Sequence, residues 1–520
     1  MKNRSRTEYS MLNIFVGLGG YTINTIISFL NRMVFVRCLS ESYLGLSALL
    51  TNFLGMLSLA ELGIGSAIIY ALYQPIAEND TKKIASLMRV YRIAYNSVGV
   101  IVTVAGLAAM PFLKNIAGDT SGIQENLYYI YLVYLFNTAS SYFFSYRSSL
   151  LTAYQRNYIV LAINYAVVIV QNTIQIILLI CLRSFAVYLL VLTVGTQLYN
   201  ALITIWTNKC YPFINSKNIE PLSKEEKHKL FRNVKSVTVY KLSGTLVNNT
   251  DNIVITYFSG LGITGLASNY ALLVNTLDSL IKQVFNSITA SVGNLNAEAD
   301  IEHQYSFFKA LNLANFWLYG WASLGVAFVS GDMVALFFGG KYVMDAAIPV
   351  MLAVNMYMVG MQNAVWTYKN TKGMFKYGQY LLLVTAGLNI IGDIVLGTLW
   401  GVFGIYLATA IARALTNAWY EPYALYRVAF HKSPLIYFKR YIRFALILMT
   451  TGFLCAILCS PLHMIPILNI IAKIGICTVV PFLVFYGCFR REPEFTYIKE
   501  VAVTIVNMIV NRVTHRMKWR

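Results

Sequence analysis

Hydrophobic residues gather in long uninterrupted stretches along this chain, and short polar segments separate them. A stretch of about twenty apolar residues is long enough to cross a bilayer as a helix. The pattern predicts fourteen membrane spans and an all-α polytopic membrane protein. Six lie near 11–36, 43–72, 90–113, 127–150, 158–182 and 184–207, and six more near 234–258, 264–291, 308–330, 344–367, 377–399 and 401–426. The last two lie near 441–460 and 466–489.

The longest hydrophilic segment divides six spans from six, as expected of a transporter built from two repeated halves. We therefore predict an N-terminal lobe at 1–207, a cytoplasmic linker at 208–235, a C-terminal lobe at 236–428 and two added spans within 429–490. The segment 491–520 alternates apolar and basic residues at helical spacing. This spacing predicts an amphipathic cytoplasmic tail on the inner membrane surface.

A faint internal repeat supports the two-lobed reading. A displacement of 220 residues superposes Gly45 on Gly265 and Leu46 on Leu266. The match covers few positions, and chance could produce it.

Composition excludes a water-soluble fold. Hydrophobic residues make up 57% of the chain and charged residues only 12%, against about 25% charged in a soluble globular protein. Lys and Arg number 41 against 22 Asp and Glu, an excess that would suggest a nucleic-acid partner in a soluble protein. In a chain of membrane spans it indicates cytoplasmic loops, so no nucleic-acid partner is expected.

The placement of basic residues predicts the orientation of the spans. The loops on one side hold only Arg37, Lys114, Arg183 and Lys341, whereas most other Lys and Arg residues flank the spans on the opposite side. Positive charge marks cytoplasmic loops. We therefore expect a multi-pass protein of the bacterial cytoplasmic membrane with both termini in the cytoplasm.

Charged residues inside spans are the candidate functional residues, because each costs about 2.5–3.5 kcal/mol at a helix centre. They fall mainly in spans 1, 2, 7, 8, 11 and 12, which predicts a water-accessible cavity between the lobes. The basic members suit an anionic substrate, and the acidic members are candidates for coupling to H⁺ or Na⁺. The substrate-binding candidates are Arg32, Lys282, Lys241 and Arg413, and the ion-coupling candidates are Glu61, Asp251, Asp278 and Asp393.

Two alternatives accompany these assignments. Some of the charges could form static ion pairs that hold the lobes together. The repeat displacement also places Asp251 beside Arg32 and Lys282 beside Glu61, so that opposite signs could face each other. Lys473 in span 14 is a further intramembrane charge outside the predicted cavity.

Motifs for catalysis are not expected. GLGITG at 260–265 matches G-x-G-x-x-G, but that motif requires a βαβ unit and here it joins two spans. The five histidines are isolated and no phosphate-binding loop for ATP is present. A polysaccharide polymerase or ligase would need a larger outer loop than 113–126 or 331–343. We expect no catalytic residues, no metal site and no cofactor.

Four segments resemble a known family. The stretch LGLSALLTNFLGMLSLAELGIGSAIIYALYQPIAENDTKKI at 44–84 resembles the second-span signature of bacterial polysaccharide-export flippases of the Wzx type. TDNIVITYFSGLGITGLASNYALL at 250–273, ITASVGNLNAE at 288–298 and LFFGGKY at 336–342 are similar to the second-half segments of that family. The resemblance covers nearly the whole chain in the same order.

This resemblance implies membership of the superfamily of multidrug, oligosaccharidyl-lipid and polysaccharide exporters, with a two-lobed fold. It implies transport of undecaprenyl-diphosphate-linked oligosaccharides from the inner to the outer leaflet, for capsule, exopolysaccharide or O-antigen, by alternating access. Other polysaccharide-assembly membrane proteins are expected partners, and basic cavity residues, here Arg32 and Lys282, would serve the headgroup. A drug or cation antiporter and a lipid II flippase remain alternatives.

Overall fold

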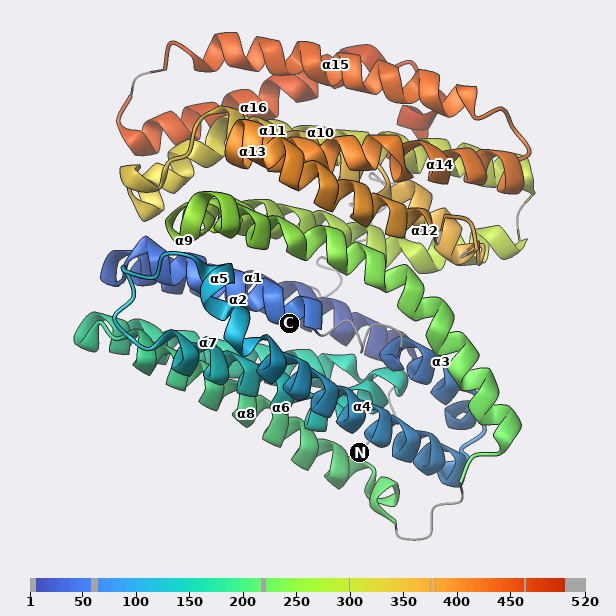
Figure 1. The fold of residues 1–520 in the computed structure, drawn as a ribbon. Coiled ribbons are helices and arrows are strands. Elements are labelled where there is room, and N and C mark those ends of the chain that lie inside the picture. Colours follow the sequence, from blue (N-terminus) through green and yellow to red (C-terminus); the bar gives the residue numbers. More distant parts are fainter. Residues whose placement is uncertain are drawn as a thin grey trace, which may run out of the picture. The chain divides into compact units, whose positions relative to one another are not determined.

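The computed structural model describes residues 6–57, 64–216, 221–298, 300–374, 376–378, 380–462 and 464–500. Within these ranges the secondary structure is helical, with no strand (Figure 1). The long helices of the first half are α1 (Arg6–Cys38), α2 (Glu41–Leu57), α3 (Ile64–Ala77), α4 (Thr81–Ala109), α6 (Leu127–Ala153), α7 (Asn157–Leu182) and α8 (Phe185–Cys210). Then follow α9 (Lys224–Glu298), α10 (Ile301–Phe338), α11 (Ala347–Gly360), α12 (Asn363–Thr371), α13 (Leu381–Leu415), α14 (Asn417–Ala424), α15 (Leu435–Cys459) and α16 (Pro466–Phe489). Short elements are η2 (Met110–Phe112), α5 (Leu113–Ala117), η3 (Pro212–Asn215), η4 (Gly340–Tyr342) and η5 (Leu425–Ala429).

The predicted all-α fold is confirmed, and within the described residues every predicted span falls on a helix or a helix pair. Spans 7 and 8 share α9, which is interrupted at Gly260 with φ 80° and ψ 170°. Spans 11 and 12 share α13 and its continuation, and Gly401 breaks α13 with φ 57° and ψ −137°. Glycine has no Cβ and adopts these backbone angles without steric cost. A glycine therefore lies at the break between the two spans that share each of these helices.

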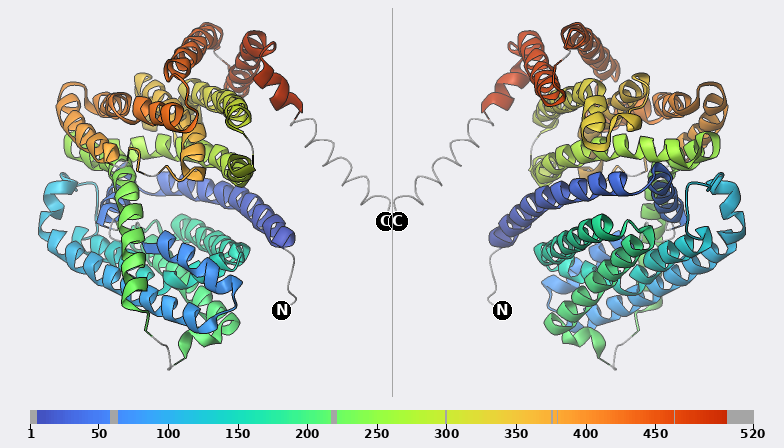
Figure 2. Two further views of the ribbon diagram at one scale, coloured as in Figure 1. Left: turned by 90° about the vertical axis from the view of Figure 1, so that its right-hand side faces the viewer. Right: turned by 90° about the vertical axis from the view of Figure 1, so that its left-hand side faces the viewer.

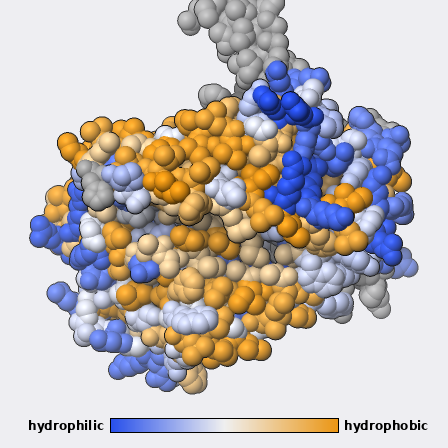
Figure 3. Space-filling model, turned by 90° about the horizontal axis from the view of Figure 1, so that it is seen from above, coloured by the Kyte–Doolittle hydropathy of each residue, from blue (hydrophilic) through white to orange (hydrophobic). Residues whose placement is uncertain are grey.

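Length and hydropathy make this a multi-pass membrane protein. Eight helical segments within the described residues are long and apolar enough to cross a bilayer. On the face drawn in Figure 3, hydrophobic residues cover the middle and hydrophilic residues gather toward the ends. Large apolar side chains of α15 and α16 are exposed, including Met449, Phe453, Ile471 and Phe482. Exposed apolar surface of this kind suits contact with lipid tails.

The backbone contacts divide the chain into two compact units, Met1–Ser268 and Asn269–Arg520. The division between the two units lies inside α9, after the polar segment 208–235. Unit 1 therefore includes the first part of α9 as well as α1 to α8.

Unit 1 is built around α6, which packs against α4 and α8, while α1 lies along α7 and α7 along α8 (Figure 2). Its interior contains buried aromatic residues such as Tyr91 and Tyr131. The Tyr131 hydroxyl donates a hydrogen bond to the carbonyl of Gly106 at 2.7 Å. Lipid tails contact apolar helix surfaces as favourably as other helices do. Polar contacts between helices, such as this hydrogen bond, therefore add specificity to the packing.

Unit 2 is built around α10, which packs against α11, α15 and α16. Phe316 of α10 stacks on Phe444 of α15, with ring centroids 4.4 Å apart, and also contacts Phe485 of α16. These rings belong to a buried cluster that includes Leu313 and Met361. The two added spans thus attach to unit 2 through aromatic packing.

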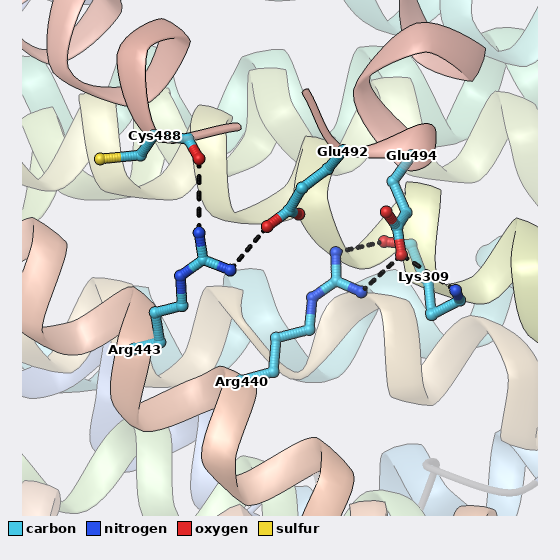
Figure 4. Close-up of polar contacts among 6 residues, drawn as sticks. All are labelled: Lys309, Arg440, Arg443, Cys488, Glu492 and Glu494. Carbon is cyan, nitrogen blue, oxygen red and sulfur yellow. Dashed lines mark hydrogen bonds and ion pairs between the residues drawn. The ribbon is translucent and has the colours of Figure 1, made fainter. Parts of the chain in front are cut away.

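The start of the C-terminal tail is attached to unit 2 by ion pairs (Figure 4). Glu494 pairs with Lys309 of α10 at 3.0 Å and with Arg440 of α15 at 3.3 Å. Glu492 pairs with Arg443 at 2.6 Å. Burial raises the pKa of Glu494, but its backbone hydrogen bond and the cations of Lys309 and Arg440 together leave that pKa below its usual value.

The predicted amphipathic tail is therefore described only at its beginning. Residues 493–500 are helical, and 501–520 lie outside the described residues. Phe495 stacks on Trp317 with ring centroids 5.6 Å apart. An apolar residue at the start of the tail therefore packs against α10 of the protein and not only against lipid.

Candidate functional site

The first candidate cation, Arg32, lies in α1 of unit 1. Its guanidinium donates a hydrogen bond to the Ser268 hydroxyl at the end of unit 1. Arg32 also lies within electrostatic range of the Tyr134 and Tyr188 hydroxyl groups. Arg32 is therefore held among hydroxyl groups, which would lower the cost of its charge inside the membrane where the sequence predicts it.

Beside Arg32, a buried amide network joins α1 to α7 and α8. The side-chain amide of Asn31 donates to Asn172 at 2.5 Å and to Gln175 at 2.8 Å. Gln175 in turn donates to the backbone carbonyl of Tyr188 at 3.1 Å. These contacts fix the orientation of α1 and thereby the position of the neighbouring residue Arg32. The members of this network are uncharged, so the pattern of charged residues within predicted spans does not reveal it.

The predicted cation Lys282 lies in α9 and pairs with another predicted residue, Asp278, at 2.6 Å. The two residues are one helical turn apart, a spacing at which side chains meet on the same face. Lys282 keeps 43% of its side chain exposed, whereas Asp278 keeps 21%. The cation therefore remains accessible while its carboxylate partner is more enclosed.

Asp278 is held from its other side by α10 of the same unit. The Tyr319 hydroxyl of α10 donates to Asp278 at 2.9 Å and accepts from the Asn363 amide of α12 at 2.6 Å. Tyr319 is fully buried and Asn363 is nearly so. A chain of four polar groups thus runs from Asn363 through Tyr319 and Asp278 to Lys282, and it fixes the position of the ammonium group.

Asp393 is the most deeply buried of the predicted ion-coupling carboxylates that the structure describes, with no exposed side-chain surface. Asn389, one turn earlier in α13, donates to Asp393 at 2.9 Å and to the Thr409 hydroxyl at 3.1 Å. Thr409 follows the break at Gly401, so the two parts of α13 meet at this polar cluster. The cluster offers carboxylate, amide and hydroxyl oxygens, which are the ligands of hard cations.

The remaining predicted residues are less closely defined. Glu61 lies outside the described residues, and Lys241 lies in α9 with its side chain undescribed. Asp251 in α9 and Arg413 in α13 are both half-buried. Lys473, assigned to span 14, pairs with Asp332 at 2.5 Å.

One buried ion pair is not apparent from the sequence. Lys369, which follows the predicted span 344–367, is buried in α12 and pairs with Glu421 of α14 at 2.8 Å. The Trp366 indole also donates to Glu421, and Lys369 donates to the carbonyl of Tyr377 at 3.0 Å. Glu421 falls within predicted span 12, so the cost of a charge in an apolar stretch could have identified it as a candidate. Its partner could be identified only from the packing of the helices.

Each unit therefore presents a cation of a predicted span on a prearranged polar network. Arg32 in unit 1 and Lys282 in unit 2 can each bind anionic oxygens, and arginine can do so with two parallel hydrogen bonds. Within the described residues, no group of three or more His, Cys, Asp or Glu side chains is arranged to hold a metal ion.

Comparison with known proteins rests on structure alone. No known protein-family description matches the sequence, and no curated protein matches it either. Among solved structures, the lipid II flippase MurJ in an inward closed conformation matches with a TM-score of 0.66. The match covers 92% of this chain and 99% of MurJ, at 15% sequence identity.

Two structures of MATE transporters also match. A multidrug resistance MATE family transporter of the MOP superfamily, in an inward-facing conformation, has a TM-score of 0.55 at 14% identity, over 77% of this chain and 95% of its own. A MATE structure in a bent conformation has a TM-score of 0.53 at 14% identity, over 86% of this chain and all of its own. At these identities the likeness establishes the fold. The chain therefore has the membrane-transporter fold that the lipid II flippase MurJ shares with MATE transporters of the MOP superfamily.

Proposed function

We propose that this protein is a flippase that moves undecaprenyl-diphosphate-linked oligosaccharides from the inner to the outer leaflet for polysaccharide biosynthesis. The observation that carries the proposal is the match to a lipid II flippase over nearly the full length of both chains. The resemblance of segments 44–84 and 250–273 to polysaccharide-export flippases directs the substrate toward an oligosaccharide. The protein would act in the bacterial cytoplasmic membrane, with both termini in the cytoplasm.

In this proposal Arg32 and Lys282 bind the diphosphate group of the lipid carrier. Both are cations within predicted spans, and each is oriented by neighbouring polar groups, Ser268 for Arg32 and Asp278 for Lys282. A diphosphate needs cationic partners to leave water, because an unpaired charge is costly to bury. Lys241 and Arg413 are proposed as further contacts along the same path.

We assign ion coupling first to Asp393. Because Asp393 is fully buried beside Asn389 and Thr409, gain or loss of a proton or of a bound cation such as Na⁺ would strongly change the electrostatic free energy of this site. Binding or release of that proton or cation would shift the conformational equilibrium of the two parts of α13 that meet at this cluster. Asp251, Asp278 and Glu61 remain further candidates. Asp278 fits this role less well because it already pairs with Lys282.

Translocation in proteoliposomes tests the function. The labelled substrate is an undecaprenyl-diphosphate oligosaccharide, and accessibility of the label at the outer leaflet is followed over time. We expect transport by the intact protein and a loss of about tenfold or more in Arg32→Ala and Lys282→Ala, from the loss of charge-assisted hydrogen bonds. Lys114→Ala, which removes an exposed cation outside the spans, serves as the matched control.

Two outcomes would overturn parts of the proposal separately. Absence of transport by the intact, folded protein would remove the flippase assignment for this substrate. Normal transport by both variants would remove the assignment of Arg32 and Lys282 while leaving the function standing.

Lipid II is the second candidate substrate, favoured by the TM-score of 0.66 with the lipid II flippase. The same assay with labelled lipid II separates the two candidates. Faster transport of lipid II than of several oligosaccharide-linked carriers would replace the first proposal with the second.

The coupling assignment has its own test. Imposed Na⁺ and H⁺ gradients should change the transport rate of the intact protein, and Asp393→Asn should abolish that dependence. Asp345→Asn, which neutralises an exposed carboxylate of unit 2, should keep it. Unchanged gradient dependence in Asp393→Asn would refute the assignment.

A further inference from the structure

An ion pair lines a pocket at the end of unit 2 that the charge pattern predicts to face the outside. Lys473 of α16, a charge within a predicted span, pairs there with Asp332 of α10 at 2.5 Å. Asn469, one turn before Lys473, donates a hydrogen bond to the same carboxylate at 3.3 Å. The three side chains line one pocket of about 650 Å³. The proposed function uses none of these residues.

The pocket lies between α10, α15 and α16, three helices that are long and apolar enough to cross a bilayer. Apolar side chains form much of the rest of its lining, among them Phe328 of α10 and Leu462 and Met464 between α15 and α16. On α16, large apolar side chains such as Ile467 and Ile471 are exposed. The polar end of the pocket therefore adjoins surface that suits contact with lipid tails.

The Lys473 ammonium group is incompletely satisfied by the protein. An ammonium group has three N–H donors, and among the described residues Asp332 is its one hydrogen-bond acceptor. Lys473 keeps 18% of its side chain exposed and Asp332 keeps 30%. Away from water, N–H donors without an acceptor are costly. An occupant that offers acceptor oxygens to Lys473 would therefore stabilise this end of the pocket.

The position of Lys473 along α16 brings its side chain close to the level of lipid headgroups. The helix begins at Pro466, and Lys473 follows two turns later, about 10 Å along the helix axis. A lysine near the end of a span can extend its side chain back toward the membrane surface. Phosphate oxygens of a lipid on this side of the membrane are therefore within its reach.

The pocket carries one positive and one negative group, which discriminates among headgroups. A purely anionic headgroup would meet the Asp332 carboxylate as well as Lys473. A phosphate linked to a primary ammonium suits both, because the phosphate accepts from Lys473 and the ammonium donates to Asp332 and to the exposed Ser460 hydroxyl of the lining. A quaternary ammonium has no N–H to donate. This chemistry favours phosphoethanolamine over phosphocholine and phosphoglycerol.

We propose that this pocket binds a phosphatidylethanolamine molecule of the outer leaflet. Lys473 binds its phosphate, Asp332 binds its ammonium group, and Asn469 holds the Asp332 carboxylate in place. The acyl chains leave the pocket over the apolar surface of α16. Bound in this way, the lipid bridges α10 and α16 at the outer end of the two added spans.

Native mass spectrometry of the full-length protein tests the site. The protein is released from nanodiscs with equal amounts of phosphatidylethanolamine, phosphatidylcholine and phosphatidylglycerol of identical acyl chains, and the retained lipids are counted. Asp332→Asn keeps the shape of the side chain and removes its charge, and the double variant Lys473→Met/Asp332→Leu removes both charges. Asp345→Asn, at an exposed carboxylate of unit 2 outside the pocket lining, is the matched control.

We expect the wild-type protein to retain phosphatidylethanolamine in preference to both other lipids. In Asp332→Asn the ratio of retained phosphatidylethanolamine to phosphatidylglycerol should fall about tenfold, because the ammonium loses a charge-assisted hydrogen bond and the anionic headgroup loses a repulsive neighbour. The double variant should lose selective retention and stay folded, since apolar side chains of similar size replace the ion pair. Asp345→Asn should match the wild type.

Three results would overturn the site. The first is equal retention of the three lipids by the wild-type protein. The second is a preference of the wild-type protein for phosphatidylglycerol, which would make Lys473 a simple anion site. The third is an unchanged lipid ratio in Asp332→Asn. Melting temperatures of all variants, measured in the same detergent, ensure that lipid retention is compared only among folded proteins.

Discussion

Gly45 of α2 and Gly265 of α9 lie face to face in unit 1. A Cβ atom on Gly265 would lie 3.0 Å from the backbone nitrogen of Gly45 and would overlap the carbonyl of Glu41, and one on Gly45 would overlap the carbonyl of Leu261. These are the two glycines that the 220-residue displacement superposes. The positions matched by the faint repeat are thus where α2 and α9 approach backbone to backbone, as small residues permit between membrane helices.

Adding a methyl group at this contact should separate the two helices. We expect Gly45→Ala and Gly265→Ala each to destabilise the packing by about 1–3 kcal/mol, the usual cost of overpacking. Thermal unfolding in detergent measures the change. Gly475→Ala is the control, because a Cβ on that helical glycine of α16 meets no atom within 4 Å. Equal melting temperatures for all three variants would contradict the close contact.

A double-mutant cycle on the Lys282–Asp278 pair distinguishes a role in substrate binding from a purely structural role. If the pair were only structural, Lys282→Ala would leave an unpaired carboxylate, and the double variant Lys282→Ala/Asp278→Ala would recover transport. If Lys282 binds the substrate, we expect the double variant to regain stability but to remain about tenfold or more slower than wild type. Translocation and melting temperature, measured on all four proteins of the cycle, decide between the two roles.

Tyr319→Phe should weaken unit 2. The hydroxyl donates to Asp278 and accepts from Asn363, so its removal leaves two enclosed polar groups each short of a partner. The expected loss is about 1–3 kcal/mol in the free energy of unfolding. Tyr357→Phe is the control, since the buried Tyr357 hydroxyl has no hydrogen-bond partner among the described residues. That variant should match wild type, and an equal loss in both variants would argue against the network.

Burial should decide the value of two ion pairs of nearly equal length. Lys369–Glu421 spans 2.8 Å with side chains 5% and 1% exposed, and Lys432–Glu302 spans 2.7 Å with side chains 25% and 72% exposed. Glu421→Gln leaves a buried cation without its counter-ion, which costs about 3–5 kcal/mol. Glu302→Gln should cost about 0–1 kcal/mol. Thermal unfolding of the two variants provides the comparison, and similar shifts would show that the first pair is hydrated.

Attachment of the tail should depend on pH through Glu494. Its pKa is lower in the folded protein than the usual 4.5, so its carboxylate stabilises the docked tail above pH 4.5. This contribution is lost as the pH falls through the lower folded pKa. A spin label at residue 497, introduced as Tyr497→Cys in a background without other cysteines, should therefore stay immobile at neutral pH and become mobile only in acid.

Glu494→Gln should mobilise the same label at neutral pH, because Lys309 and Arg440 lose their shared partner. Glu225→Gln, at an exposed carboxylate of unit 1, should leave the label immobile. An immobile label in Glu494→Gln would show that aromatic packing of Phe495 on Trp317 is sufficient to hold the tail.

The sequence alone determined the helices and the intramembrane charges. Span length follows from bilayer thickness and a charge in an apolar stretch is costly wherever it lies, so both are local properties that the order of residues reveals. Even the Asp278–Lys282 pair could have been predicted from its spacing of four residues.

Only the tertiary structure decided which groups meet across helices. Tyr319 and Asn363 complete the Asp278 network from α10 and α12, Glu421 compensates Lys369, and Asp332 of α10 meets Lys473 of α16. These contacts depend on the rotation of each helix about its axis and on the residues at which neighbouring helices cross. Hydropathy along one chain does not encode either quantity, because a lipid-facing and a protein-facing apolar side chain look the same in sequence.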